Sequence, residues 1–229
     1  MKTLLICEHE TLTRKGLVAI VENSPEVKIA GDVGGSDAAL DHLRHNETDI
    51  LMLEWRLPGG MGLELIERAR LLRPKLTVMV VTNSGDEPFA SRLLESGVTV
   101  LVSKNAPPTE LMQGLCAAAS QRLYVSAHIA QQITYAKLTG TEQSLLSELS
   151  NRELQIMMLL VDGVSVQDTA TRLCLSPKTV STYRSRMFEK VGVRSDAELT
   201  RLAFRHGLLE QEMPMTLPLL TQIVAIPQH

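Results

Sequence analysis

Hydrophobic and polar positions follow two different periods along the first half of the chain. Five apolar runs rich in β-branched residues predict strands, and the amphipathic stretches between them, with apolar residues three or four positions apart, predict helices. The predicted strands cover residues 3–7, 27–33, 49–54, 76–82 and 99–104. Strands that alternate with helices through short connections predict a parallel sheet with helices on both faces. Residues 1–122 are therefore expected to form an α/β domain with a five-stranded, doubly wound parallel sheet.

Four helix starts follow one another between residues 148 and 209. At three of them a serine is followed three positions later by an acidic residue, and at the fourth it is followed by a proline suited to the first helical position. The four serines are Ser150, Ser165, Ser176 and Ser195. Only the residues "LCL" separate the second and third predicted helices, a turn short enough for a helix-turn-helix unit. Residues 148–209 are expected to form an all-α helix-turn-helix domain.

Two segments fall outside these patterns. Residues 123–147 are predicted to be a linker that is partly helical. Residues 210–229 form an apolar tail that is nearly uncharged past Glu212, and Pro214, Pro218 and Pro227 exclude a continuous membrane helix within it. We expect a frayed or surface-docked tail, with a dimer contact as the alternative.

The charges are distributed unevenly along the chain. The net charge is −3, yet residues 151–208 carry 9 Lys and Arg against 6 Asp and Glu. A basic C-terminal segment after a more acidic first half indicates different partners for the two domains. The cysteines, Cys7, Cys116 and Cys174, lack metal-type spacing and argue for a reducing compartment. The short apolar run at the N-terminus is neither a signal peptide nor a membrane span, so the expected location is the cytoplasm, with no membrane partner.

The third predicted helix of the basic segment has the composition of a DNA recognition helix. Val180, Tyr183, Met187 and Val191 form one apolar stripe that suits burial against neighbouring helices. The other faces carry short hydroxyl side chains, which can approach base edges in the major groove, and cations, which can reach phosphates. An ordinary solvated basic helix is the alternative, but the tight turn and the clustered cations favour binding to double-stranded DNA. The candidate DNA-binding residues are Lys178, Thr179, Ser181, Thr182, Arg184, Ser185, Arg186 and Lys190.

Side chains that can carry chemistry lie where the predicted strands end, the edge at which parallel sheets collect their ligands. Glu8 and His9 follow the first strand, Glu54 and Thr82 end the third and fourth, and Lys104 ends the fifth. Two acids, a hydroxyl and a lysine are therefore expected to converge. A metal-sensing or pH-sensing role for His9 is one hypothesis, and an ordinary hydrogen-bonded surface histidine is the alternative.

Three stretches carry a family resemblance: "LSNRELQIMMLLVDG", "LSPKTVSTYRSRMFEKVGV" and "ELTRLAFRHGLL". Together with the order of the five strand–helix units before them, they resemble the NarL/LuxR-type response regulators of two-component systems, and most closely the GacA/UvrY group. The resemblance implies a receiver domain that accepts a phosphoryl group on an aspartate with the help of Mg²⁺. It also implies a LuxR-type helix-turn-helix domain that binds DNA as a dimer.

Carried over residue by residue, the resemblance implies an atypical receiver. The acceptor aspartate falls on Glu54, the acidic pair on Glu8 and His9, and the conserved hydroxyl and lysine on Thr82 and Lys104. An imidazole in place of a carboxylate removes an oxygen ligand that Mg²⁺ favours, so no cofactor is expected and Mg²⁺ binding should be weak or absent. The extra methylene of Glu54 disfavours phosphoryl transfer, and a cognate histidine kinase is therefore not expected.

The role of Glu54 has two interpretations. As a fixed charge paired with Lys104, it could mimic phosphorylation, although one charge is less than that of a phosphate. Alternatively, it is a remnant of a lost site. Leu101 stands where the family has an aromatic residue, three positions before the lysine, and this disfavours a full mimic.

These features predict a DNA-binding transcription regulator, homodimeric and independent of phosphorylation. The alternative is a regulator that acts mainly by protein–protein contact, by pairing with or sequestering another regulator. An enzymatic function is not expected, because the sequence offers no nucleophile–base pair and no glycine loop that could hold a phosphate.

Overall fold

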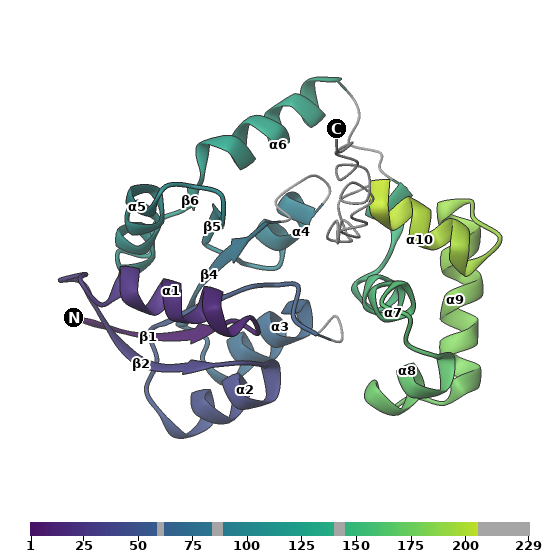
Figure 1. Cartoon of the computed structure of the whole chain (residues 1–229), viewed down its shortest axis with the longest axis horizontal. Coiled ribbons are helices and arrows are strands. Elements are labelled where there is room, and N and C mark those ends of the chain that lie inside the picture. Colours follow the sequence, from purple (N-terminus) through teal and green to yellow (C-terminus); the bar gives the residue numbers. More distant parts are fainter. Residues whose placement is uncertain (59–61, 84–88, 140–144, 206–229) are drawn as a thin grey trace, which may run out of the picture.

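The computed structural model describes residues 1–58, 62–83, 89–139 and 145–205, and its first domain is a parallel sheet between two helical layers (Figure 1). The strand order is β2-β1-β3-β4-β5-β6, with every neighbouring pair parallel. The predicted tail, residues 210–229, lies outside the described residues. The strands are β1 (Lys2–Cys7), β2 (Val27–Val33), β3 (Ile50–Leu53), β4 (Thr77–Thr82), β5 (Val100–Ser103) and β6 (Tyr124–Val125).

The sheet has six strands where the sequence predicts five. The sixth, β6, lies in the segment predicted to be a linker and pairs with β5 at the edge of the sheet. The backbone N–H of Tyr124 donates to the carbonyl of Thr99 at 3.1 Å, and that of Ser126 to the carbonyl of Leu101 at 2.9 Å. Two residues are too few to show a period-two pattern, which explains why the sequence does not reveal this strand.

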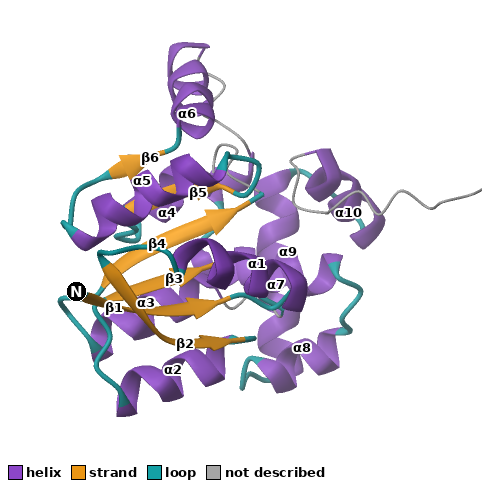
Figure 2. Cartoon of the chain, turned by 60° about the vertical axis from the view of Figure 1, so that its left-hand side comes forward, coloured by secondary structure: helices purple, strands orange, loops and turns teal. Residues whose placement is uncertain are grey.

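Figure 2 shows the strands of the sheet together with the helices that pack around them. Alternate residues of the central strand β1 belong to different hydrophobic cores. Leu4 and Ile6 of β1 contribute to the core under α1 and α5, whereas Leu5 and Cys7 contribute to the core under α2, α3 and α4. All four side chains are fully buried, as expected for a central strand covered on both faces. The helices of this domain are α1 (Thr11–Val21), α2 (Ser36–His45), α3 (Gly62–Leu72), α4 (Phe89–Glu95) and α5 (Pro108–Ala119).

A linking helix, α6 (Ala127–Thr139), and a 3₁₀ turn, η1 (Leu145–Glu148), lead to the second domain. The serines predicted to start its helices do so: the hydroxyls of Ser150, Ser165 and Ser176 each accept a backbone N–H of the first turn. Ser195 accepts the N–H of Glu198 in the same way. The helices are α7 (Asn151–Val161), α8 (Val166–Arg172), α9 (Pro177–Val191) and α10 (Asp196–Arg205). Within the described ranges, no helix is long and apolar enough to cross a membrane.

Helix α7 connects the two domains. It is buried almost all round because one side packs against α8, α9 and α10 and another faces the first domain. The side-chain amide of Gln155 donates to Glu64 of α3 at 3.0 Å, and that of Asn151 donates to Glu67 at 2.9 Å. Arg92 of α4 donates to the carbonyl of Leu149 just before α7. The domains therefore meet through α7 and the chain that precedes it.

Candidate functional site

The carboxyl ends of four neighbouring strands bring together the side chains predicted to meet there. Glu8 follows β1, Glu54 follows β3, Thr82 ends β4 and Lys104 follows β5. Both carboxylates are buried, and the side chain of Lys104 is only 12% exposed. The Lys104 ammonium lies 2.7 Å from Glu8 Oε2 and 3.1 Å from Glu54 Oε2, so one cation neutralises much of the charge of two acids.

The second oxygen of Glu54 has its own donors. Thr82 Oγ1 donates to Glu54 Oε1 at 2.8 Å, and the backbone N–H of Arg56 donates to the same atom at 2.9 Å. One oxygen therefore faces a hydroxyl and an amide, and the other faces the ammonium of Lys104. Buried carboxylates are stable only with such partners, and these partners fix the orientation of the Glu54 side chain.

Glu8 is held on its other side by the loop that follows β1. Its Oε1 accepts the backbone N–H of Glu10 at 2.9 Å and lies 3.2 Å from His9 Nδ1. Glu10, which the sequence did not single out, adds a third carboxylate 3.7 Å from the Lys104 ammonium. Within the described part of the chain, no three His, Cys, Asp or Glu side chains are placed to hold a metal ion.

The charges of this cluster contribute to raised pKa values at Lys104 and Cys7. Burial alone lowers the pKa of Lys104, but the charges of Glu54 and Glu8 and their hydrogen bonds outweigh it, so the pKa is raised. The thiol of Cys7 points into the core, and burial, aided by the charge of Glu8, raises its pKa to about 12. Lys104 is therefore a permanent cation and Cys7 a neutral packing residue at neutral pH.

The residue after Glu54 connects this cluster to the second domain. Trp55 is buried and stacks on Phe89 of α4, with ring centroids 5.2 Å apart and planes 22° apart. It also lines a cavity of about 300 Å³ together with Leu154 and Met158 of α7. A side chain at Gly62 would collide with the carbonyl of Trp55, so the glycine permits α3 to begin against this loop. Trp55 is thus a packing residue beside the cluster.

The predicted recognition helix is α9, and its two sides differ as the sequence indicates. Val180, Met187 and Val191 are buried, and Tyr183 is partly buried against α7 and α8. The predicted hydroxyl residues Ser181, Thr182 and Ser185 are exposed, whereas Thr179 is half-buried and its hydroxyl bonds the Ser176 cap. The outward face of α9 is open to solvent over most of its length.

The predicted phosphate-contacting cations of α9 fall into two pairs. Arg184 donates through Nε and Nη2 to both carboxylate oxygens of Asp196, each at 2.8 Å, and its guanidinium lies over the ring of Phe188. Hydrogen bonding to Asp196 raises the pKa of Arg184. Lys190 lies 2.6 Å from Glu153 Oε2, in the capping box that starts α7. Arg184 and Lys190 therefore both form ion pairs within the second domain.

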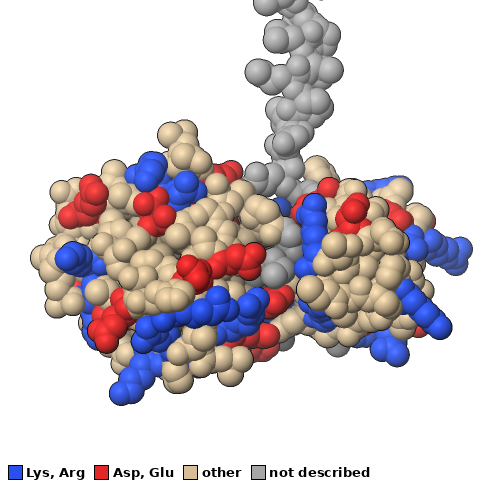
Figure 3. All heavy atoms as spheres, turned by 90° about the horizontal axis from the view of Figure 1, so that it is seen from below, with Lys and Arg blue, Asp and Glu red and all other residues tan. Residues whose placement is uncertain are grey.

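Lys178 and Arg186 form the other pair. Their side chains are exposed, and among the described residues neither has an ion-pair or hydrogen-bond partner. Figure 3 shows Lys and Arg side chains projecting from the end of the molecule formed by α8, α9 and α10. Lys178 lies in the first turn of α9 and Arg186 two turns later, so the two cations bracket the exposed hydroxyls.

Two family models match the chain, one in each of its two domains. The model "Response regulator receiver domain" matches residues 4–115, and "Bacterial regulatory proteins, luxR family" matches residues 147–203. The response regulator UvrY of Escherichia coli K12 is 32% identical over 213 residues, which cover 93% of this chain and 97% of UvrY. The response regulator GacA of Pseudomonas protegens is also 32% identical, over 93% of this chain and all of GacA.

A solved structure shares the two-domain fold. It is RcsB of Salmonella enterica serovar Typhimurium, bound to promoter rprA in the presence of the phosphomimetic BeF₃⁻. The TM-score is 0.70 at 22% identity, over 88% of this chain and 98% of RcsB. The chain belongs to the DNA-binding response regulators of the luxR family. Within that class it is homologous to UvrY and GacA, which confirms the predicted resemblance and fold class.

Proposed function

We propose that the protein is a homodimeric transcription regulator that binds double-stranded DNA through α9 without phosphoryl transfer to its receiver. The observation that carries this proposal is the Glu54 carboxylate, which already bonds Thr82 and Lys104. In the family these two positions are the conserved hydroxyl and lysine of the acceptor pocket. Glu54 thus presents a carboxylate to the partners that a phosphoryl group would engage, which favours the mimic over the remnant.

The same contacts argue against phosphorylation of Glu54. An acceptor carboxylate must present an oxygen to the phosphorus atom in line with the leaving group. Both oxygens of Glu54 are instead engaged, one with Lys104 and one with Thr82 and the Arg56 amide. Phosphorylation would have to break contacts that stabilise a buried charge.

The surrounding residues do not fit Mg²⁺. Mg²⁺ needs several oxygen ligands at about 2.0–2.1 Å in octahedral geometry. Here the Lys104 ammonium lies between Glu8 and Glu54, and His9 offers an imidazole where the family has a second carboxylate. A cation therefore already occupies the position between the two acids. No step of the proposed function depends on a metal ion.

The domain arrangement supports DNA binding without phosphorylation of the receiver. The receiver contacts α7 through Gln155 and Asn151, whereas Lys178, Ser181 and Arg186 on α9 are exposed. Helix-turn-helix proteins bind two half-sites as dimers, with the second helix in the major groove. The open face of α9 has the hydroxyls and cations that this mode requires.

The test combines a mass measurement with a binding measurement. Incubation of the full-length protein with acetyl phosphate and Mg²⁺ should leave its intact mass and its duplex affinity unchanged. Its duplex affinity should fall steeply with salt concentration, because phosphate contacts release counterions. A stable phosphoryl adduct on the receiver would disprove phosphorylation independence, and a lack of duplex binding would disprove the DNA-binding role.

A second candidate function is a regulator that works mainly by contact with another regulator. The observation in its favour is that Arg184 and Lys190 are tied to Asp196 and Glu153, which leaves fewer cations for DNA. Under this alternative, promoter occupancy in the cell would depend on the partner regulator. Occupancy by this protein in a strain that lacks other luxR-family regulators separates the two functions.

A further inference from the structure

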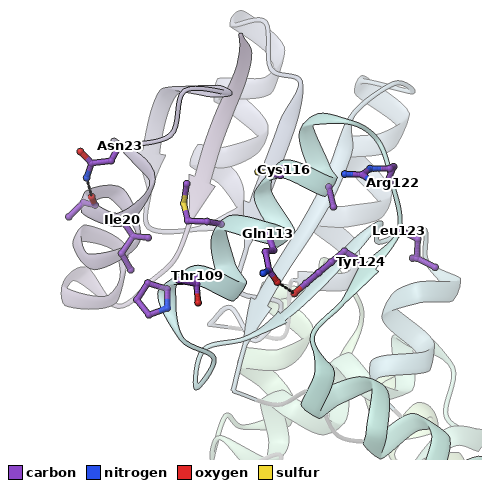
Figure 4. Close-up of a pocket in the computed structure, with 12 residues that line it drawn as sticks. Ile20, Asn23, Thr109, Gln113, Cys116, Arg122, Leu123 and Tyr124 are labelled. Carbon is purple, nitrogen blue, oxygen red and sulfur yellow. Dashed lines mark hydrogen bonds between the residues drawn. The ribbon is translucent and has the colours of Figure 1, made fainter.

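The largest groove of the described chain lies in the first domain, between α1, α5 and β6, and has a volume of about 960 Å³ (Figure 4). Its lining is mainly apolar. Two of its polar side chains bond to neighbours, because the Tyr124 hydroxyl donates to Gln113 and the Asn23 amide donates to the carbonyl of Ala19. An apolar lining does not select one class of ligand. An ion pair beside the DNA-binding face is more selective, because a guanidinium recognises carboxylates and phosphates.

This ion pair joins Arg184 of α9 to Asp196, the first residue of α10. Nε and Nη2 of Arg184 donate to the two carboxylate oxygens, each at 2.8 Å, and the guanidinium lies 4.6 Å from the centre of the Phe188 ring. Arginine binds a phosphate group with the same fork of two donors. Asp196 therefore occupies the donor positions that a phosphate of DNA would need.

The pair lies at the surface, where its partners can be exchanged. The side chain of Arg184 is 34% exposed, and that of Asp196 is 54% exposed. The ion pair between Lys190 and Glu153 differs, because Glu153 is only 4% exposed and also accepts from Ser150. An exposed ion pair contributes little to stability, so another anion can replace Asp196 at small cost. Asp196 also lies in the first turn of α10, where the helix dipole favours a negative charge after the arginine has left.

Arg184 lies on the side of α9 that the two unpaired cations leave without a positive charge. Lys178 and Arg186 are eight residues apart and share one side of the helix, whereas Ser181, Arg184 and Phe188 follow one another at spacings of three and four on the next side. A helix in the major groove has a phosphate backbone on each side. Of the four cations of α9, Arg184 is the one that can serve the second backbone.

We propose that Asp196 is an intramolecular competitor of DNA, which holds Arg184 in the free protein and is displaced by a backbone phosphate when the duplex binds. This inference rests on the proposed DNA-binding function and adds a second state of Arg184 to it. One anion replaces another on the same two donors, so the exchange leaves no buried charge unpaired. The ion pair thus reserves Arg184 for a phosphate that the other contacts of α9 hold in place.

A double-mutant cycle tests this competition on the full-length protein with a fluorescein-labelled duplex of mixed sequence. Asp196→Asn removes the competing charge and should tighten binding by about fivefold, the contribution of a strong exposed ion pair. In an Arg184→Ala background the same substitution should change affinity by less than about twofold, because no arginine is left to release. In the Asp196→Asn background, Arg184→Ala should reduce the slope of log affinity against log salt by about one.

Glu198→Gln is the matched control. Glu198 is exposed, lies in the same first turn of α10 and accepts the backbone N–H of Arg194, a role that glutamine can also fill. The substitution removes the same charge from a residue that is not the partner of Arg184, and it should change affinity by less than about twofold. The urea unfolding midpoint of Asp196→Asn should stay near that of the parent, because an exposed pair is not needed for the fold.

The possible results separate this inference from the function on which it rests. Weaker binding by Asp196→Asn would show that the ion pair positions α9, and equal tightening in both Arg184 backgrounds would show a general effect of charge. Either result would overturn the inference and leave the DNA-binding role in place. A parent protein that binds no duplex at low salt would overturn the proposed function and this inference together.

Discussion

Lys104 in the receiver lies within about 3 Å of two buried carboxylates, whereas Lys178 and Arg186 on α9 have no described partner and face solvent. The first cation holds a closed cluster together, and the other two are available to an external anion. A buried charge is stable only when it is paired, so the charged groups of the receiver cluster bind one another. An exposed charge is stabilised by water and needs no partner within the protein, so it can bind a phosphate. The comparison shows that the charged side chains at the carboxyl ends of the strands are part of the internal structure of the first domain, whereas the outward face of α9 remains exposed.

The largest expected effect comes from removing the central cation of the receiver cluster. Lys104→Met leaves Glu8 and Glu54 buried without their counter-charge, and loss of one partner from a buried ion pair typically costs about 3–5 kcal/mol. Urea unfolding of the full-length protein measures this loss. Lys28→Met, at an exposed position, should change stability by less than about 0.5 kcal/mol.

A rescue experiment tests the cause. If the loss reflects unpaired carboxylates, the addition of Glu8→Gln and Glu54→Gln to Lys104→Met should recover much of the stability. If the triple variant were no more stable than Lys104→Met alone, packing rather than charge would explain the loss.

The second prediction concerns the open cations of α9. Lys178→Ala with Arg186→Ala should weaken duplex binding by about 100-fold and reduce the slope of log affinity against log salt by about two. Lys28→Ala with Lys75→Ala removes the same charge from exposed positions on the receiver and should leave affinity nearly unchanged. Fluorescence anisotropy at several salt concentrations measures both quantities, and equal losses in the two double variants would contradict a specific role for α9.

The sequence predicts the elements of both domains better than the partners of their charges. Apolar runs and serine caps are local signals, so the first five strands and the starts of α7 to α10 could be located. The short strand β6 could not, because two residues carry no period. Charge patterns indicate where cations cluster but not what they bind. Arg184 meets Asp196 twelve positions away, and Lys190 meets Glu153 across 37 positions, and only the packing of the helices brings these pairs together.

The third prediction concerns the ion pair between Lys190 and Glu153. Its partner Glu153 is buried, and although burial alone raises the pKa of this carboxyl, the bonds from Lys190 and Ser150 outweigh burial and lower it. A carboxyl with a lowered pKa stabilises the fold above its unfolded pKa, and this stabilisation disappears as the pH falls. Glu153→Gln should therefore cost about 1.5 kcal/mol at pH 7 and less at pH 4. Urea unfolding at the two pH values measures the difference, and Glu189→Gln, at an exposed position on α9, should show no such change.

The smallest effect on duplex affinity is expected from a substitution of Glu54. It tests whether the receiver cluster is coupled to the DNA-binding helix α9. Glu54→Gln keeps a side chain that can accept from Thr82 and Arg56 but removes the charge that faces Lys104, while Glu8 continues to pair with the lysine. If the fixed charge sets the state of the receiver, duplex affinity should fall by about fivefold, the low end of typical coupling between sites. Glu47→Gln, exposed on the receiver, is the matched control. Unchanged affinity in Glu54→Gln, with its stability preserved, would identify Glu54 as a structural remnant and confine the function of the receiver to contacts made through α7.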